Sequence, residues 1–121
     1  MKNPGELILN LMNARTVAHV MHLSVSGPGS YARHKALQEF YEGIGDLADR
    51  IAEAYIGCYG ELIKFAGVSY KLEKDPLVML EALKAAVAKA RAEEESTMLQ
   101  QILDDTAELI ADTAYKIKFL A

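Results

Sequence analysis

The sequence contains one cysteine, Cys58, and no tryptophan. A single cysteine excludes an internal disulfide, so nothing indicates a disulfide-stabilised secreted scaffold. Long apolar runs are also absent, because none reaches the roughly 18 residues that a membrane span requires. What the chain does have is a 51% share of hydrophobic residues and 25% charged residues. That balance is typical of one soluble domain with a buried core.

Basic residues are in the minority, since 13 lysines and arginines face 17 aspartates and glutamates and give a formal net charge of −4. This charge argues against a bulk electrostatic nucleic-acid binder. The N-terminal segment does not predict a signal peptide, because Glu6 and Asn10 interrupt the apolar stretch that follows Gly5. We therefore expect a cytoplasmic protein without a membrane partner. The cytoplasm is that of the protein's own cell or, for a virus-encoded protein, that of an infected cell.

Apolar residues recur at steps of three and four, and strand-like alternation is absent. The segment Gly27-Pro28-Gly29 predicts a break between the first two helices, with Ser30 as the cap of the second. Asp75-Pro76 predicts the start of the third, with Asp75 as its N-cap. Helices are expected at about 4–22, 31–55 and 76–91, followed by one that begins after Ser96. The second could continue to Phe65, although Gly57 and Gly60 each cost about 1 kcal/mol in a helix interior.

The sequence does not decide whether a helix ends before Ser96, because the segment from Lys84 to Phe119 contains no glycine or proline. One long helix over 76–119 is an alternative, but Ser96 and Thr97 are good N-caps and favour a break. Four amphipathic helices predict an all-α four-helix bundle that spans residues 1–121 as one domain. The middle connection, about 66–74, is just long enough to cross such a bundle lengthwise, so an up-down-down-up order is possible but not required.

Each expected helix has an inward face. On the first and third helices these positions are Leu7, Leu11, Ala14, Ala18, Met21, Leu80, Leu83, Val87 and Ala90. On the second and fourth they are Leu37, Tyr41, Ile44, Ala48, Ala52, Tyr55, Leu99, Ile102, Thr106, Leu109 and Thr113. We expect these side chains to form the core.

A polar stripe borders the inward face of the second helix. At about 100° per residue, the stripe spans roughly 100° of the helix surface, and it holds His34, Gln38, Glu42, Asp49 and Glu53. Imidazole nitrogens and carboxylate oxygens suit iron, manganese or zinc. Asp49 and Glu53 lie one turn apart and can approach one ion together.

Plainer interpretations apply to the same residues. An Asp49/Glu53 pair is most often a solvated helix face, and His22 at the end of a helix is often a satisfied polar residue near the C-terminal dipole. His34 is less easily explained in this way, because the dipole at a helix start disfavours a cation. His19 is interpreted as a surface residue or a contact to a partner.

The order of these residues resembles the Dps branch of the ferritin-like proteins. The run from His22 to His34, HLSVSGPGSYARH, resembles the Dps signature H-W-x-V-x-G-x-x-F-x-x-x-H without gaps, with Leu23 in place of the usual tryptophan and Ser30 in place of the phenylalanine. Further along, Asp46-Leu47-Ala48-Asp49-Arg50-Ile51-Ala52-Glu53 resembles the D-x-x-A-E stretch of that branch. The chain also resembles a shorter Dps-like group found in tailed-phage genomes, so a virion location and a virion partner enter as possibilities.

The resemblance implies a ferritin-like bundle with a ferroxidase centre between two subunits. One subunit would supply His22 and His34, and the other would supply Asp49 and Glu53. It implies iron as the bound ion and at least a dimer, with zinc or manganese as other options. Gln38 stands where the family has an aspartate, and Glu42 is a nearby carboxylate that could compensate. The chain lacks the basic tail that many Dps proteins use to bind DNA, so DNA binding is not expected.

A second hypothesis has the same fold but no metal-dependent activity. In it, the chain is a non-enzymatic helical bundle with a degenerate metal site, used for structure or for interaction with another protein, for example in a virion. Metal content after purification and oxidation of Fe(II) distinguish the two hypotheses.

Overall fold

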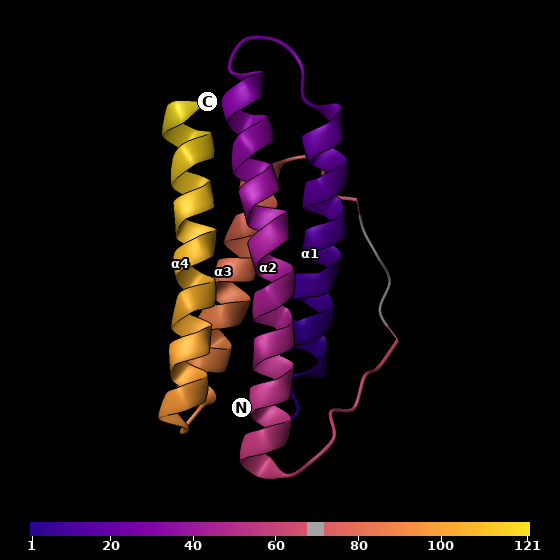
Figure 1. Cartoon of the computed structure of the whole chain (residues 1–121), viewed down its shortest axis with the longest axis vertical. Helices are drawn as coiled ribbons and strands as arrows, with labels where there is room; N and C mark the ends of the chain where they lie inside the picture. Colours follow the sequence, from indigo (N-terminus) through magenta and orange to yellow (C-terminus); the bar gives the residue numbers. More distant parts are fainter. Residues whose placement is uncertain (68–71) are drawn as a thin grey trace.

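The computed structural model describes residues 1–67 and 72–121, and Figure 1 shows the whole chain. The described residues form four helices: α1 (Gly5–Ser24), α2 (Ser30–Tyr59), α3 (Pro76–Glu93) and α4 (Thr97–Leu120). None of the described residues lies in a strand. The predicted all-α architecture with four helices is therefore confirmed, and the break before Ser96 separates α3 from α4.

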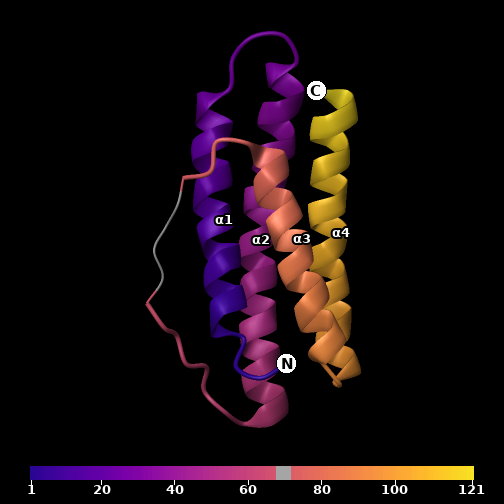
Figure 2. The same ribbon diagram turned by 180° about the vertical axis from the view of Figure 1, so that it is seen from behind.

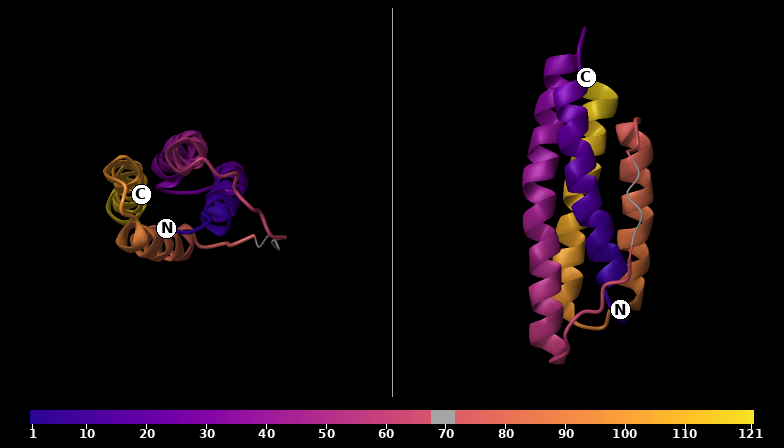
Figure 3. Two further views of the ribbon diagram at one scale, coloured as in Figure 1. Left: turned by 90° about the horizontal axis from the view of Figure 1, so that it is seen from below. Right: turned by 90° about the vertical axis from the view of Figure 1, so that its right-hand side faces the viewer.

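The helices surround one core in the spatial order α1, α2, α4, α3, as the end-on view in Figure 3 shows. Figures 1 and 2 show that α1 and α2 form an antiparallel hairpin, and that α3 and α4 form another. Helix α2 ends near Met1, whereas α3 begins at the opposite end of the bundle. The chain thus follows the up-down-down-up order, one of the two arrangements that the sequence left open.

The helix ends follow local backbone chemistry. The Asp75 side chain accepts a hydrogen bond from the Leu77 amide at 2.9 Å, and Ser96 accepts one from the Leu99 amide at 3.4 Å. The prediction that Ser30 caps α2 is wrong. Ser30 is the first residue of the helix, and Gly29 precedes it with a φ of 78°, which suits glycine.

Helix α2 extends past residue 55, the earlier of its two predicted ends, because it passes through Gly57 and ends at Tyr59. Gly60 terminates it with a φ of 65° and donates its amide to the Ile56 carbonyl at 2.8 Å. The left-handed conformation at Gly60 is the common glycine stop of a helix. The connection to α3 begins at residue 60, whereas the sequence indicated a connection over about 66–74. Residues 68–71 within it, including Tyr70, lie outside the described part of the chain.

The core is made mostly of the predicted positions. All nine inward residues expected on the first and third helices are buried. Tyr41, Ala52 and Leu109 are only partly buried, whereas Leu103, Ile110 and Ile117 complete the inner face of α4. The hydroxyls of Thr106 and Thr113 donate to the carbonyls of the residues four positions earlier, which satisfies them inside the core.

Among residues 1–67 and 72–121, no helix combines the length and the apolar character that crossing a membrane requires.

Candidate metal centre

His22 and His34 lie side by side at one end of the bundle. His22 belongs to the last turn of α1 and His34 to the second turn of α2, and the short turn between the two helices places these turns at the same level. Their imidazole rings stack with centroids 3.6 Å apart and planes 22° apart. His22 is only 7% exposed, so the pair is part of the packed structure and not a mobile surface feature.

The ring of each histidine is hydrogen-bonded to the backbone of the other. Nδ1 of His22 lies 2.8 Å from the His34 carbonyl oxygen, and Nδ1 of His34 lies 2.9 Å from the His22 carbonyl oxygen. A carbonyl oxygen only accepts hydrogen bonds, so both Nδ1 atoms must carry a hydrogen. In the neutral ring, Nε2 then keeps its lone pair. An Nδ1–H bond to a carbonyl is a common support of metal-binding histidines.

Two more rings extend this pair. Tyr41 meets His22 edge-on, with centroids 5.3 Å apart and an angle of 73°. His19 stacks on Tyr41 with centroids 4.3 Å apart and an angle of 13°. The sequence predicted Tyr41 in the core and His19 at the surface or in contact with a partner. It did not predict that His19, His22, His34 and Tyr41 form one aromatic cluster. The available signal was the spacing: His19 precedes His22 by one helical turn, and Tyr41 follows His34 by two.

The two predicted carboxylate ligands lie elsewhere on α2. Asp49 and Glu53 are exposed, 15 and 19 residues beyond His34. At 1.5 Å per residue they are about 22 Å and 28 Å further along the helix. One chain therefore does not bring them to its own histidine pair. In the described part of the chain, no three histidine, cysteine, aspartate or glutamate side chains converge enough to hold a metal ion.

Gln38 lies on the same stripe of α2 as His34. Its side-chain amide donates to the Glu42 carboxylate at 3.1 Å. This bond turns the amide nitrogen towards Glu42 and leaves the Gln38 carbonyl oxygen free to accept a hydrogen bond or to ligate a cation. An amide oxygen is a weaker ligand for a hard cation than the carboxylate of an aspartate.

A cavity of about 490 Å³ lies on the outer side of the α1–α2 pair. Its polar lining comprises Arg15, Thr16, His19, Glu42, Asp46 and Asp49. Arg15 lies flat against α2 where Gly45 has no side chain, since a Cβ on Gly45 would be 3.1 Å from Arg15 Cδ. Among the described residues, none of the three lining carboxylates forms an ion pair within 4 Å.

These observations define a small all-α protein with a supported histidine pair at one end and an acidic groove beside it. The chain belongs to DUF5856, a family of unknown function, which it matches over residues 22–117. The match runs from the last turn of α1 to the last turn of α4. No curated protein and no solved structure matches the chain.

Proposed function

We propose that this protein is a ferritin-like, Dps-like protein that binds a transition metal at an interface between two subunits, with iron as the substrate ion. The observation that carries the proposal is the mutual support of His22 and His34. Each ring donates Nδ1–H to a backbone carbonyl and keeps the Nε2 lone pair for a metal ion. Nitrogen ligands of this kind suit iron, zinc and manganese.

The arrangement of helices supports the same proposal. Ferritin-like bundles contain one long crossover that joins two antiparallel hairpins. Here the connection between Tyr59 and Pro76 joins opposite ends of the bundle. Fold analogy alone does not establish activity, so the histidine pair carries the functional part of the argument.

A second subunit supplies the carboxylates in this proposal. Midway along α2 between His34 and the Asp49–Glu53 pair are Glu42 and Gly43. A two-fold axis near this point brings the histidines of each subunit to the carboxylates of the other, because a two-fold interface repeats every contact. The α1–α2 face at this level also exposes apolar side chains, which favour burial in an interface: Met12 is 40% exposed, Val20 is 44% and Leu23 is 73%.

The chemistry follows from these ligands. His22 and His34 of one subunit, with Asp49 and Glu53 of the other, would bind Fe(II), and Gln38 and Glu42 would lie beside the site. Oxidation of that iron by oxygen or peroxide is the activity that the resemblance to Dps adds. The protein's own contribution is ligand identity and position.

The test separates the ligand atom from the structural hydrogen bond of the same residue. In His34→Asn, the amide nitrogen can replace the Nδ1–H donor to the His22 carbonyl, but no atom replaces Nε2. We expect affinity for Fe(II) or Zn(II) to fall by about 10- to 100-fold with the helical circular dichroism unchanged. Lys84→Asn, at an exposed position of α3 outside the proposed site, is the control and should retain metal binding. Metal analysis after purification, isothermal titration calorimetry and Fe(II) oxidation provide the readouts.

The alternative is a non-enzymatic bundle used for structure or interaction, and Gln38 favours it by removing a charged ligand. Gln38→Asp distinguishes the two functions, because restoring the carboxylate should raise metal affinity or the rate of Fe(II) oxidation. If neither the wild type nor this variant binds a transition metal, the interaction role replaces the metal-binding proposal.

A further inference from the structure

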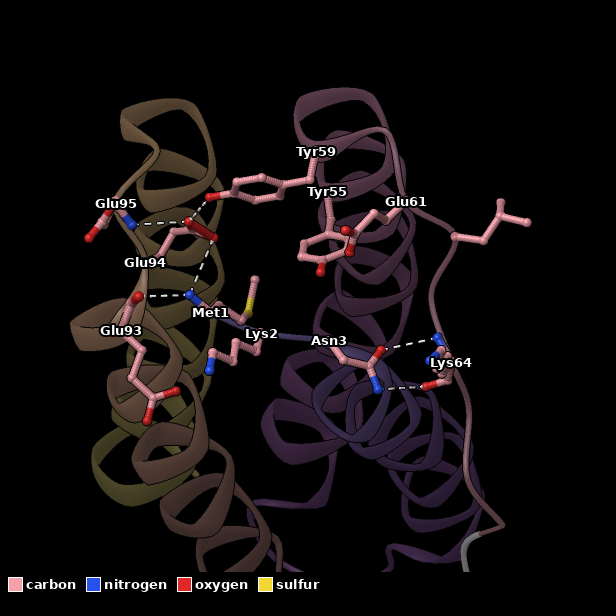
Figure 4. Close-up of a pocket in the computed structure, with 11 residues that line it drawn as sticks. Met1, Lys2, Asn3, Tyr55, Tyr59, Glu61, Lys64, Glu93, Glu94 and Glu95 are labelled. Carbon is pink, nitrogen blue, oxygen red and sulfur yellow. Dashed lines mark hydrogen bonds and ion pairs between the residues drawn. The ribbon is translucent and has the colours of Figure 1, made fainter.

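A second cavity, of about 600 Å³, lies at the end of the bundle opposite the histidine pair. Figure 4 shows its walls, which come from the chain start, the last turns of α2, the connection that follows, and the α3–α4 junction. Its lining comprises Met1, Lys2, Asn3, Tyr55, Tyr59, Glu61, Leu62, Lys64, Glu93, Glu94 and Glu95. The volume is within the range of pockets that hold small molecules.

Glu94 gives this cavity its chemical character. The residue is only 3% exposed. Its Oε1 atom accepts hydrogen bonds from the Tyr59 hydroxyl, from the Glu95 amide at 3.0 Å and from the Ser96 amide at 3.3 Å. Its Oε2 atom is buried and accepts no hydrogen bond in the described structure. A buried carboxylate oxygen without a donor is unfavourable, so this atom calls for a ligand that supplies one.

The nearest cation shows which kind of donor suits Oε2. The Met1 amino group lies 3.9 Å from it, which is an ion pair too long for a hydrogen bond, and it donates instead to the Glu93 carbonyl at 2.7 Å. A primary ammonium is therefore accommodated beside Glu94. A ligand ammonium that approaches to hydrogen-bond distance would improve on this contact and take the place of the Met1 amino group.

The other walls favour an organic cation. The rings of Tyr55 and Tyr59 lie 5.1 Å apart and offer aromatic surface to an apolar body or to a cation. The Asn3 side chain pins the connection by bonding both the amide and the carbonyl of Lys64 at 3.0 Å, which fixes the far wall. No three carboxylates converge among the described residues, so a bare metal ion lacks its ligand set.

We propose that this cavity binds a small organic molecule with a primary ammonium group, which donates to Glu94 Oε2 while its apolar part contacts Tyr55 and Tyr59. Four glutamates line the cavity against two lysines and the Met1 amino group, and this small excess of negative charge favours a cation over an anion. The proposal does not depend on the metal site, which lies at the other end of the bundle.

The first test uses the unaltered chain with its amino group free. Phenethylammonium chloride and the neutral phenethyl alcohol are titrated separately by calorimetry. The two probes share a shape and differ in charge. We expect saturable binding of the ammonium and at least about tenfold weaker binding of the alcohol, because a charged donor forms the stronger bond to a carboxylate. Absence of saturable ammonium binding, or equal affinity for both probes, overturns the proposal.

The second test uses Glu94→Gln, which keeps an oxygen for the three Oε1 donors and removes the charge. We expect phenethylammonium affinity to fall by at least about tenfold. Glu108→Gln removes the same charge from an exposed position of α4 outside the cavity and should leave affinity unchanged. Equal affinity in all three proteins contradicts the proposal. If Glu94→Gln does not fold, NMR of the wild type decides: ammonium-induced shifts must centre on the amides of Tyr59, Glu95 and Ser96.

Discussion

The two ends of the bundle solve the problem of buried polar groups in different ways. At one end, His22 and His34 each give a ring hydrogen to the backbone carbonyl of the other. At the other end, three donors converge on Oε1 of Glu94 and none reaches Oε2. The first end leaves an Nε2 lone pair on each histidine ring. The second leaves Oε2 of Glu94, a carboxylate oxygen that accepts no hydrogen bond.

This difference predicts different partners. A nitrogen lone pair binds a metal ion, whereas a carboxylate oxygen without a donor binds an N–H group. In the proposed metal site, the histidine pair takes its carboxylates from a second subunit, because Asp49 and Glu53 of the same chain lie far along α2. The Glu94 cavity, in contrast, draws all its walls from one chain. Assembly should therefore matter at the first end and not at the second.

The largest expected effect is on stability at the Glu94 end. Glu94→Ala leaves the Tyr59 hydroxyl and two amides without an acceptor, and it leaves the Met1 amino group without a counter-charge. We expect the free energy of unfolding to fall by about 3 kcal/mol, measured by urea denaturation with circular dichroism. Glu108→Ala, at an exposed position, should change it by less than about 0.5 kcal/mol.

A loss below about 1 kcal/mol in Glu94→Ala would break the comparison. It would mean that water replaces the carboxylate at no cost, and that the three donors do not depend on Glu94.

The next effect tests assembly. Thr16 lines the cavity on the α1–α2 face near the proposed two-fold axis, where Thr16→Arg places a second cation and a large side chain. We expect the proposed dimer to dissociate and metal affinity to fall at least about tenfold, with binding of phenethylammonium unchanged. Light scattering and calorimetry measure the two. Ala85→Arg, on an exposed position of α3, is the matched control and should leave both unchanged.

Two results would contradict the shared-site proposal. One is a wild-type protein that is monomeric at micromolar concentration. The other is a monomeric Thr16→Arg protein that keeps full metal affinity, because its own carboxylates are too far away to supply the site.

Much of the fold could be predicted because its signals are local. Gly27-Pro28-Gly29 separates α1 from α2, and Asp75-Pro76 and Ser96 mark the starts of α3 and α4 through caps within three residues. The inward faces of α1 and α3 follow from periodicity alone. The cap of α2 was mispredicted because serine is the usual capping residue, whereas here a left-handed glycine starts the helix.

The two sites could be predicted less fully from the sequence, because they depend on contacts between residues that are distant in the chain. His22 and His34 stood out by residue type and spacing, but the mutual hydrogen bonds that fix their rings are visible only once α1 and α2 pack together. Glu94 has no distinguishing sequence context in a run of three glutamates. Its carboxylate accepts a hydrogen bond from Tyr59, 35 residues away, in the last turn of a helix whose end the sequence left open between Tyr55 and Phe65.

The smallest expected effect is on the pH dependence of stability. The hydrogen bond that Tyr59 donates to Glu94, reinforced by partial desolvation, raises the pKa of Tyr59 from 10.0 to about 12. The folded protein therefore holds this proton more tightly than the unfolded chain does. The associated stabilisation is fully present below pH 10 and is lost as the pH rises from 10 towards 12.

Tyr59→Phe removes that contribution and leaves the ring in place. The wild type should be more stable than this variant below pH 10, and the difference should shrink above it. Tyr115→Phe, at an exposed tyrosine on α4, is the matched control for the loss of a hydroxyl. Urea unfolding at a series of alkaline pH values measures the difference, and the late ionisation of Tyr59 in a near-ultraviolet titration should be absent from Tyr59→Phe. If the latest ionisation survives in Tyr59→Phe, the Glu94 carboxylate does not accept the Tyr59 hydrogen in solution, and the contrast between its two oxygens no longer holds.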